Sequence, residues 1–321
     1  MSSAVDRPEV GATVQPSERE GQTFVGDSLL ARYASFVKLP HTLFALPFAG
    51  VGAILATRER PDVLTLSTVF WIVLAFTAAR FAAMGFNRIV DRRWDALNPR
   101  TRMRELPAGR LGVGQATAAV AVASALFIVA AWQLNPLCGW LSPLALAWVF
   151  FYSYTKRFTA WAHLVLGFGL GIAPSGAYLA VTGAWSEPWW ALVALTSAVM
   201  LWAGGFDIIY SVQDESFDRE HGLHSIPARL GTRRALGTAR LLHFLATVLF
   251  FVIWWRQSFA VGWFYLAGVG VMAVLLHFAH ASLRGDPSKL DFKRIDRAFF
   301  HTNVGVSTSF FVLTLLDRIF V

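Results

Sequence analysis

The chain has 321 residues, of which 55% are hydrophobic and only 15% are charged, and its mean hydropathy is +0.51. Soluble domains carry about 25% charged residues, so this composition excludes an ordinary soluble domain and indicates a polytopic membrane protein. The net charge of +8 is compatible with nucleic-acid binding. However, the arginines cluster beside apolar segments, which favours membrane topology and no nucleic-acid partner. The single cysteine, Cys138, excludes an intrachain disulfide.

Residues 1–27 are polar and lack the apolar core of a signal peptide, so we expect a disordered cytoplasmic tail there. Apolar runs of roughly 20 residues then recur to the end of the chain, and each could cross a bilayer. We predict an all-α domain over residues 28–321 with nine transmembrane helices. Their approximate ranges are 35–57, 63–95, 113–133, 136–154, 159–183, 188–217, 232–256, 261–284 and 296–318.

The connections between these spans alternate in charge. Those after the second, fourth, sixth and eighth spans are rich in Arg and Lys, and the others are poor in them or balance them with acids. By the positive-inside rule the amino terminus and the basic loops are cytoplasmic, and an odd number of spans places the carboxyl terminus outside. We therefore expect an integral protein of a bacterial inner membrane.

Two acidic clusters end two long spans on the predicted cytoplasmic side. In the second span Asn87, Asp91 and Asp95 are spaced i, i+4, i+8, and therefore share one helix face. In the sixth span Asp207, Asp214 and Asp218 are spaced i, i+7, i+11, with Tyr210 one turn after Asp207, which again predicts one face.

The segments that follow the two clusters resemble each other. "ELPAGRLG" (105–112) follows the first and "HSIPARLG" (224–231) follows the second. We interpret this as an internal duplication that divides the domain into two pseudo-repeat halves, each with an acidic helix end and a cap-like loop. A glycine-rich run at 166–183 predicts close helix packing through small residues.

Two rows of carboxylates that face each other repel, so a cation is expected between them. Mg²⁺ prefers carboxylate oxygens together with waters and substrate phosphates, which suggests a clamp for a diphosphate. Arginines can hold phosphate oxygens bidentately. The candidates are Arg88, Arg92, Arg102 and Arg104.

These motifs resemble the signatures of the UbiA family of intramembrane prenyltransferases. The first resemblance is Asn87-x₃-Asp91-x₃-Asp95 followed by Asn98, Arg100, Thr101 and Arg104, and the second is Asp207-x₂-Tyr210-x₃-Asp214-x₃-Asp218. "YSYTKRFT" (152–159) is also similar to a family segment. Within the family the chain looks most like 4-hydroxybenzoate polyprenyltransferases, and "KLPHTLFALPFA" (38–49) is similar to relatives of menaquinone pathways.

The resemblance implies nine helices around a central cavity with cytoplasmic cap loops, Mg²⁺ as cofactor, and a polyprenyl diphosphate and an aromatic acid as substrates. It implies a metal–diphosphate site made of Asn87, Asp91, Asp95, Asp207, Asp214 and Asp218. Lys156 and Arg157 match positions implicated in binding phosphate or the acceptor carboxylate. Arg88, Glu105 and His224 depart from the usual pattern, which bears on the acceptor more than on the reaction.

The implied reaction is ionisation of the allylic diphosphate followed by attack of an electron-rich ring carbon on the allyl cation. We expect Asp91, Asp95, Asp214, Asp218 and Tyr210 to be catalytic, although the sequence does not choose the group that removes the ring proton. The prenyl tail needs an apolar channel open to membrane lipid. Lys38 either contacts substrate or extends its ammonium to the interface.

Two other classes of protein remain as alternatives. A CDP-alcohol phosphotransferase also places aspartates at helix ends, but it needs one compact signature, whereas this chain has two separated ones. A transporter with inverted repeats would place its acids near the middle of the membrane rather than at one surface.

Overall fold

The computed structural model describes residues 28–38, 45–285 and 292–320, and every regular element in these ranges is helical. The long helices are α3 (Leu66–Leu97), α4 (Val113–Leu134), α5 (Pro136–Thr155), α6 (Ala162–Thr182), α7 (Trp189–Ser211), α10 (Thr232–Trp255), α11 (Trp263–Ser282) and α12 (Phe292–Phe320). The short ones are α1 (Leu29–Phe36), α2 (Leu46–Ala56), η3 (Val212–Asp214), α8 (Glu215–Glu220), α9 (Ile226–Leu230) and η4 (Ser258–Ala260). The all-α class is therefore confirmed, while the tail predicted at 1–27 lies outside these ranges.

Eight helical stretches within the described ranges are long and apolar enough to cross a membrane, and they match the predicted spans from 63–95 onward. The first predicted span, 35–57, is different. Helix α1 ends at Phe36, and Lys38 adopts a left-handed backbone conformation with φ of 47°, which a continuing α-helix does not allow. Helix α2 has 11 residues, or about 17 Å, against a hydrocarbon core of about 30 Å. The described residues thus hold eight full-length candidate spans and one shorter apolar helix, where nine spans were predicted.

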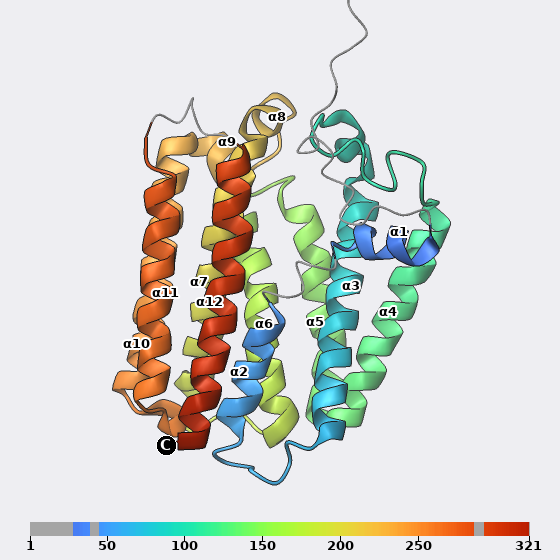
Figure 1. Cartoon of the computed structure of the whole chain (residues 1–321). Coiled ribbons are helices and arrows are strands. Elements are labelled where there is room, and N and C mark those ends of the chain that lie inside the picture. Colours follow the sequence, from blue (N-terminus) through green and yellow to red (C-terminus); the bar gives the residue numbers. More distant parts are fainter. Residues whose placement is uncertain (1–27, 39–44, 286–291, 321) are drawn as a thin grey trace, which may run out of the picture.

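The long helices stand side by side and reverse direction at each connection, with α2 parallel to them and α1 lying across the bundle (Figure 1). Glycines bring α6 close to its neighbours. A Cβ atom at Gly171 or Gly167 would overlap a backbone carbonyl of α7, and one at Gly52 of α2 would overlap the carbonyl of Pro174 in α6. The packing role predicted for the glycine-rich run is therefore confirmed.

Helix α7 is held in place by an aromatic core. Phe48 of α2 packs against Trp202 of α7 and Phe310 of α12, with ring centroids 4.8 and 5.9 Å apart. Phe250 of α10 adds a contact to Phe310 at 4.8 Å, and all four side chains are nearly or fully inaccessible to solvent. These contacts fix α7 in the middle of the bundle, so that its last turns hold Asp207 and Tyr210 in a defined position.

The charge-rich connections gather at one end of the bundle. The loop after α3, the turn after α5 and the segment with α8 and α9 all lie at the upper end in Figure 1, whereas the carboxyl-terminal end of α12 lies at the lower end. This end-to-end asymmetry is what the alternating loop charges predict. Both acidic clusters belong to the charge-rich end.

Candidate active site

A cavity of about 830 Å³ runs through the bundle between α3, α5, α6 and α7. Its wall includes α3 side chains from Ile72 to Arg88, which corresponds to about 24 Å of helix. Most of the wall is apolar, and it includes Phe127, Trp148 and Phe168. Most of the charged and phenolic lining lies toward the charge-rich end, where Lys38, Asn87, Arg88, Arg104, Tyr152, Asp207 and Tyr210 are found. Arg80, Ser175, Thr196 and Ser197 add polar groups deeper in the cavity. The shape suits a ligand with a long apolar tail and a charged head.

The first cluster lies along the last turns of α3, as its spacing predicted. Asn87 donates its amide N–H to Asp91 Oδ2 at 2.8 Å. Asp95 Oδ1 accepts a hydrogen bond from Arg104 Nη1 at 2.7 Å, whereas its Oδ2 is buried and has no hydrogen-bond partner among the described residues. Arg157 Nη2 lies 3.6 Å from Asp91 Oδ1 and donates to the carbonyl of Val90.

The second cluster is less regular than predicted. Helix α7 ends at Ser211, and the 3₁₀ turn η3 leads into α8, so Asp207, Asp214 and Asp218 do not lie on one continuous α-helix. A 3₁₀ turn has three residues per turn instead of 3.6, which rotates every later side chain. Each carboxylate therefore has its own partners: Asp207 contacts His163 at 2.7 Å, Asp214 contacts Arg100, and Asp218 lies buried near Lys156.

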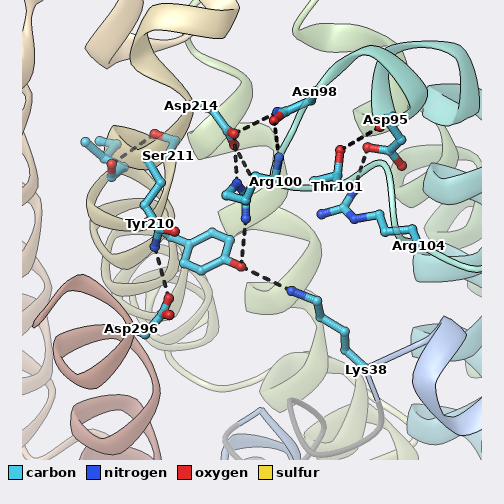
Figure 2. Close-up of polar contacts among 12 residues, drawn as sticks. Lys38, Asp95, Asn98, Arg100, Thr101, Arg104, Tyr210, Ser211, Asp214 and Asp296 are labelled. Atoms are coloured by element: carbon cyan, nitrogen blue, oxygen red, sulfur yellow. Dashed lines mark hydrogen bonds and ion pairs between the residues drawn. The ribbon is translucent and has the colours of Figure 1, made fainter. Parts of the chain in front are cut away.

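Arg100 is the residue that joins the first loop to the end of α7. Its Nε and Nη2 donate to the two oxygens of Asp214 at 2.9 and 2.5 Å, and its Nη1 donates to the Tyr210 hydroxyl at 3.1 Å. Asn98 donates a further hydrogen bond to Asp214 Oδ1 at 2.9 Å. Figure 2 shows the guanidinium between the carboxylate and the phenol, with Arg104 and Asp95 paired beside it.

Lys38 approaches the same phenol from the other side. Its ammonium donates to the Tyr210 hydroxyl at 3.1 Å (Figure 2) and lies 5.4 Å from the ring centroid. The Tyr210 ring packs on Phe299 of α12, with centroids 4.5 Å apart. A phenol oxygen that accepts from two cations has its own O–H free to donate to an anion. Lys38 and Tyr210 line the head of the cavity, and Arg100 contacts the same phenol, so this corner has the chemistry to accept an anion.

Lys156, just after α5, carries a charge that acts on carboxylates of both clusters. Burial disfavours its charged form, but Asp218, Tyr152, Asp207 and Asp214 more than offset this, and the pKa of Lys156 lies above its ordinary value. Its charge also acts on Asp91 of the first cluster. One ammonium is therefore within electrostatic range of both clusters, which start about 120 residues apart in sequence.

Some predicted site residues lie elsewhere. Arg92 donates to the carbonyl of Ile89 on its own helix, and Arg102 is exposed; neither lines the cavity. Arg157 is partly exposed beside Asp91 and does not line the cavity, whereas Arg88 is buried in the cavity wall. Neither Arg100 nor His163 was nominated from the sequence. Asn98 and Arg100 belong to the segment after Asp95 that resembles the first family signature, whereas no motif near His163 indicates a role in the site.

The carboxylates fit a hard divalent cation. Among the described residues no three His, Cys, Asp or Glu side chains are grouped closely enough to hold a metal by themselves. However, each cluster offers a buried carboxylate oxygen with no hydrogen-bond partner in the described chain, Asp95 Oδ2 and Asp218 Oδ2. Mg²⁺ usually takes only one or two protein carboxylates and completes its shell with waters and substrate phosphates. The donor set therefore suits a cation that binds together with a phosphate ligand.

Comparisons with known proteins agree with the signatures. The chain is 29% identical over 252 residues to the 4-hydroxybenzoate octaprenyltransferase of Methylobacillus flagellatus, covering 78% of this chain and 81% of that protein. The apo structure of a UbiA homolog from Aeropyrum pernix K1 superposes with a TM-score of 0.76 at 33% identity, covering 86% of this chain and 98% of that one.

A UbiA homolog from Archaeoglobus fulgidus, solved bound to GPP and Mg²⁺, has the same fold. Its TM-score is 0.66 at 18% identity, and the match covers 90% of this chain and 99% of that one. Residues 45–304 match the UbiA prenyltransferase family, in agreement with the paired signatures and the helical membrane fold. The chain is an integral membrane enzyme that belongs to the UbiA prenyltransferase family.

Proposed function

We propose that this enzyme transfers a polyprenyl group from a polyprenyl diphosphate to 4-hydroxybenzoate, as in ubiquinone biosynthesis. The observation that carries the proposal is that both aspartate clusters lie within electrostatic range of Lys156 at the charge-rich end of a long apolar cavity, which Asn87 and Asp207 themselves line. A diphosphate head fits the charged end, and an isoprenoid tail fits the apolar part. The relative from Methylobacillus flagellatus is named for this activity, which supports the choice of acceptor.

The cation would be held by Asn87, Asp91, Asp95, Asp214 and Asp218. The family resemblance also places Asp207 in this set, but Asp207 lines the cavity with one oxygen held by His163, and we propose removal of the ring proton as its role instead. When bound, it would neutralise the charge of the diphosphate and make it a better leaving group. The Archaeoglobus fulgidus homolog was solved with GPP and Mg²⁺, which supports Mg²⁺ as the cation here. Asp214 is paired with Arg100 in this structure, so we propose that Arg100 turns toward phosphate oxygens when the cation binds.

The basic residues in the cavity wall would bind the two anionic substrates. Arg104 and Lys156 lie beside the clusters and suit the diphosphate, with Arg88 deeper in the wall. Lys38 and the Tyr210 hydroxyl, which line the cavity, suit the carboxylate of the aromatic acid. Bidentate and charge-assisted hydrogen bonds of this kind fix orientation as well as affinity.

The reaction then follows from these positions. The allylic C–O bond breaks, the ring carbon ortho to the acceptor hydroxyl forms the new C–C bond, and the ring proton leaves to a base. Asp207 is the only carboxylate of the two clusters found among the described cavity-lining residues, and its Oδ1 accepts no hydrogen bond from the described residues. We therefore favour Asp207 as the proton acceptor over Asp214 and Asp218, which are engaged or buried outside the cavity.

The test is an assay of the purified full-length protein with labelled farnesyl diphosphate and a panel of hydroxybenzoates and hydroxynaphthoates. The proposal predicts a prenylated 4-hydroxybenzoate that forms with Mg²⁺ and does not form with EDTA. Prenylation of a hydroxynaphthoate alone would instead support the menaquinone-type acceptor. Absence of transfer to every acceptor would refute the proposed reaction.

We also propose that the charge-rich end faces the cytoplasm of a bacterial inner membrane, with the carboxyl terminus outside, because Lys and Arg accumulate in the loops at that end. A carboxyl-terminal alkaline phosphatase fusion should be active, and a green fluorescent protein fusion should be dark. The reverse pattern would overturn the orientation. The division of the domain into two pseudo-repeat halves stays a proposal based on the matching segments after the two clusters.

A further inference from the structure

His163 is a buried histidine that does not line the cavity itself but contacts Asp207, a residue of the cavity wall. It lies at the start of α6, is fully inaccessible to solvent, and places its Nδ1 2.7 Å from Asp207 Oδ2. Asp207 in turn lines the cavity. A buried imidazole in contact with a carboxylate of the site can fix the direction in which that carboxylate points.

The contact at His163 Nε2 shows which ring nitrogen carries the proton. The backbone N–H of Ile226 donates to Nε2 at 3.3 Å, so Nε2 acts as an acceptor. A neutral imidazole has one N–H, which must then be on Nδ1 and points at Asp207 Oδ2. The geometry leaves Asp207 Oδ1 as the oxygen available to the cavity.

Ile226 belongs to a short segment that holds three parts of the site. The N–H of His224 donates to the carbonyl of Lys156 at 2.7 Å, and the neighbouring Ser225 side chain interacts with the carboxylate of Asp218. Through Ile226 and His163 the same segment also reaches Asp207. The segment 224–226 therefore contacts Lys156 and Asp218 directly and Asp207 through His163.

We propose that His163 is a positioning residue for Asp207, an inference that rests on the prenyl transfer proposed above. The Nδ1–H holds Oδ2 and thereby keeps Oδ1 directed at the acceptor ring. Without this donor, Asp207 turns toward the ammonium of Lys156, which lies within electrostatic range of it. The ring proton then loses its acceptor, although both substrates still bind.

Three substitutions distinguish donation of a hydrogen bond to Asp207 from a role of the His163 side chain in packing alone. In His163→Asn the amide nitrogen lies where Nδ1 lay and still donates to Asp207. In His163→Gln the amide reaches the position of Nε2, so it can satisfy the Ile226 N–H but presents no donor at the Nδ1 position. His163→Leu removes both interactions. His277→Asn, on an exposed position of α11, is the matched control.

The proposal predicts that kcat falls by about 10- to 100-fold in His163→Gln and His163→Leu, the range for a lost hydrogen bond to a charged group. KM for the prenyl diphosphate should change by less than about threefold, because binding does not depend on Asp207 orientation. His163→Asn should keep kcat within about fivefold of the natural protein. A purely structural role predicts the opposite order, with Gln at least as active as Asn, and that result would overturn the proposal.

A second measurement does not depend on activity. In protein labelled with ¹⁵N-histidine, the signal missing from the spectrum of His163→Asn should be that of a ring protonated at Nδ1 and bare at Nε2. A ring protonated at Nε2 would overturn the proposal. Failure of the natural protein to prenylate any acceptor would refute the proposed function, while the tautomer would still report on the contact between His163 and Asp207.

Discussion

Arg100→Ala removes the guanidinium that ties the loop after α3 to the end of α7. Arg100 and Asp214 side chains are only 15% and 9% exposed, so the pair is nearly buried. Removing one partner of a buried ion pair costs about 3–5 kcal/mol, because the other charge is left without compensation. Asn98 still donates to Asp214 and Lys156 still lies nearby, so we expect the lower end of this range, about 3 kcal/mol.

The assay is thermal unfolding of the purified protein in detergent, with and without Mg²⁺. Arg100→Ala should unfold at a clearly lower temperature than the natural protein. It should also gain more from millimolar Mg²⁺, because Asp214 Oδ2 has then lost its donor and Oδ1 keeps only Asn98 among the described residues. A ligand at ten times its Kd adds about 1.4 kcal/mol. Arg102→Ala, two residues away and exposed, should match the natural protein.

An unchanged melting temperature in Arg100→Ala would refute the reasoning. An identical response to Mg²⁺ in the variant and the natural protein would refute the idea that Arg100 competes with the cation for Asp214.

Three further predictions concern catalysis and stability. Asp91→Asn and Asp214→Asn should each abolish detectable prenyl transfer while the protein remains folded in the membrane; normal turnover by either variant would remove the metal–diphosphate clamp. EDTA should stop transfer and excess Mg²⁺ should restore it, so a chelator-resistant enzyme would contradict a divalent cofactor. Asp317→Ala should lower the free energy of unfolding by about 3 kcal/mol without changing kcat, because Asp317 accepts from the N–H groups of Gly262, Phe264 and Tyr265 at the start of α11. Equal thermal stability of Asp317→Ala and the natural protein would show that this cap is dispensable.

The spans could be predicted because apolar runs of membrane length leave few alternatives. Where the prediction was wrong, the cause is local backbone geometry. The prediction for 35–57 runs one span through Lys38, whose left-handed conformation interrupts the helix. Pro40, two residues later, is a sequence signal that a helix ends or kinks at this point. The prediction that Asp207, Asp214 and Asp218 share one face assumes an α-helical period throughout. The residues of Val212–Asp214 give no sequence signal for the 3₁₀ turn that breaks this period.

The acidic residues could be found from sequence, but their partners could not. Five arginines stand close together between Arg88 and Arg102. They look alike in sequence, yet Arg100 reaches Asp214 across 114 positions while Arg102 is exposed. His163 and Asp207 are 44 positions apart on different helices. Such contacts depend on how helices pack, and a single sequence gives the packing only through resemblance to a known family.

The central claim is that both aspartate clusters serve one diphosphate site. The most direct measurement is the affinity of the full-length protein for farnesyl thiodiphosphate, a slowly ionising analogue, in the presence of Mg²⁺. Asp91→Asn and Asp214→Asn should each weaken binding at least about 30-fold, and the double variant should lose less than the sum of the two free-energy changes, because the residues act on one ligand. Binding of natural strength in either single variant, or strictly additive losses, would contradict a shared site.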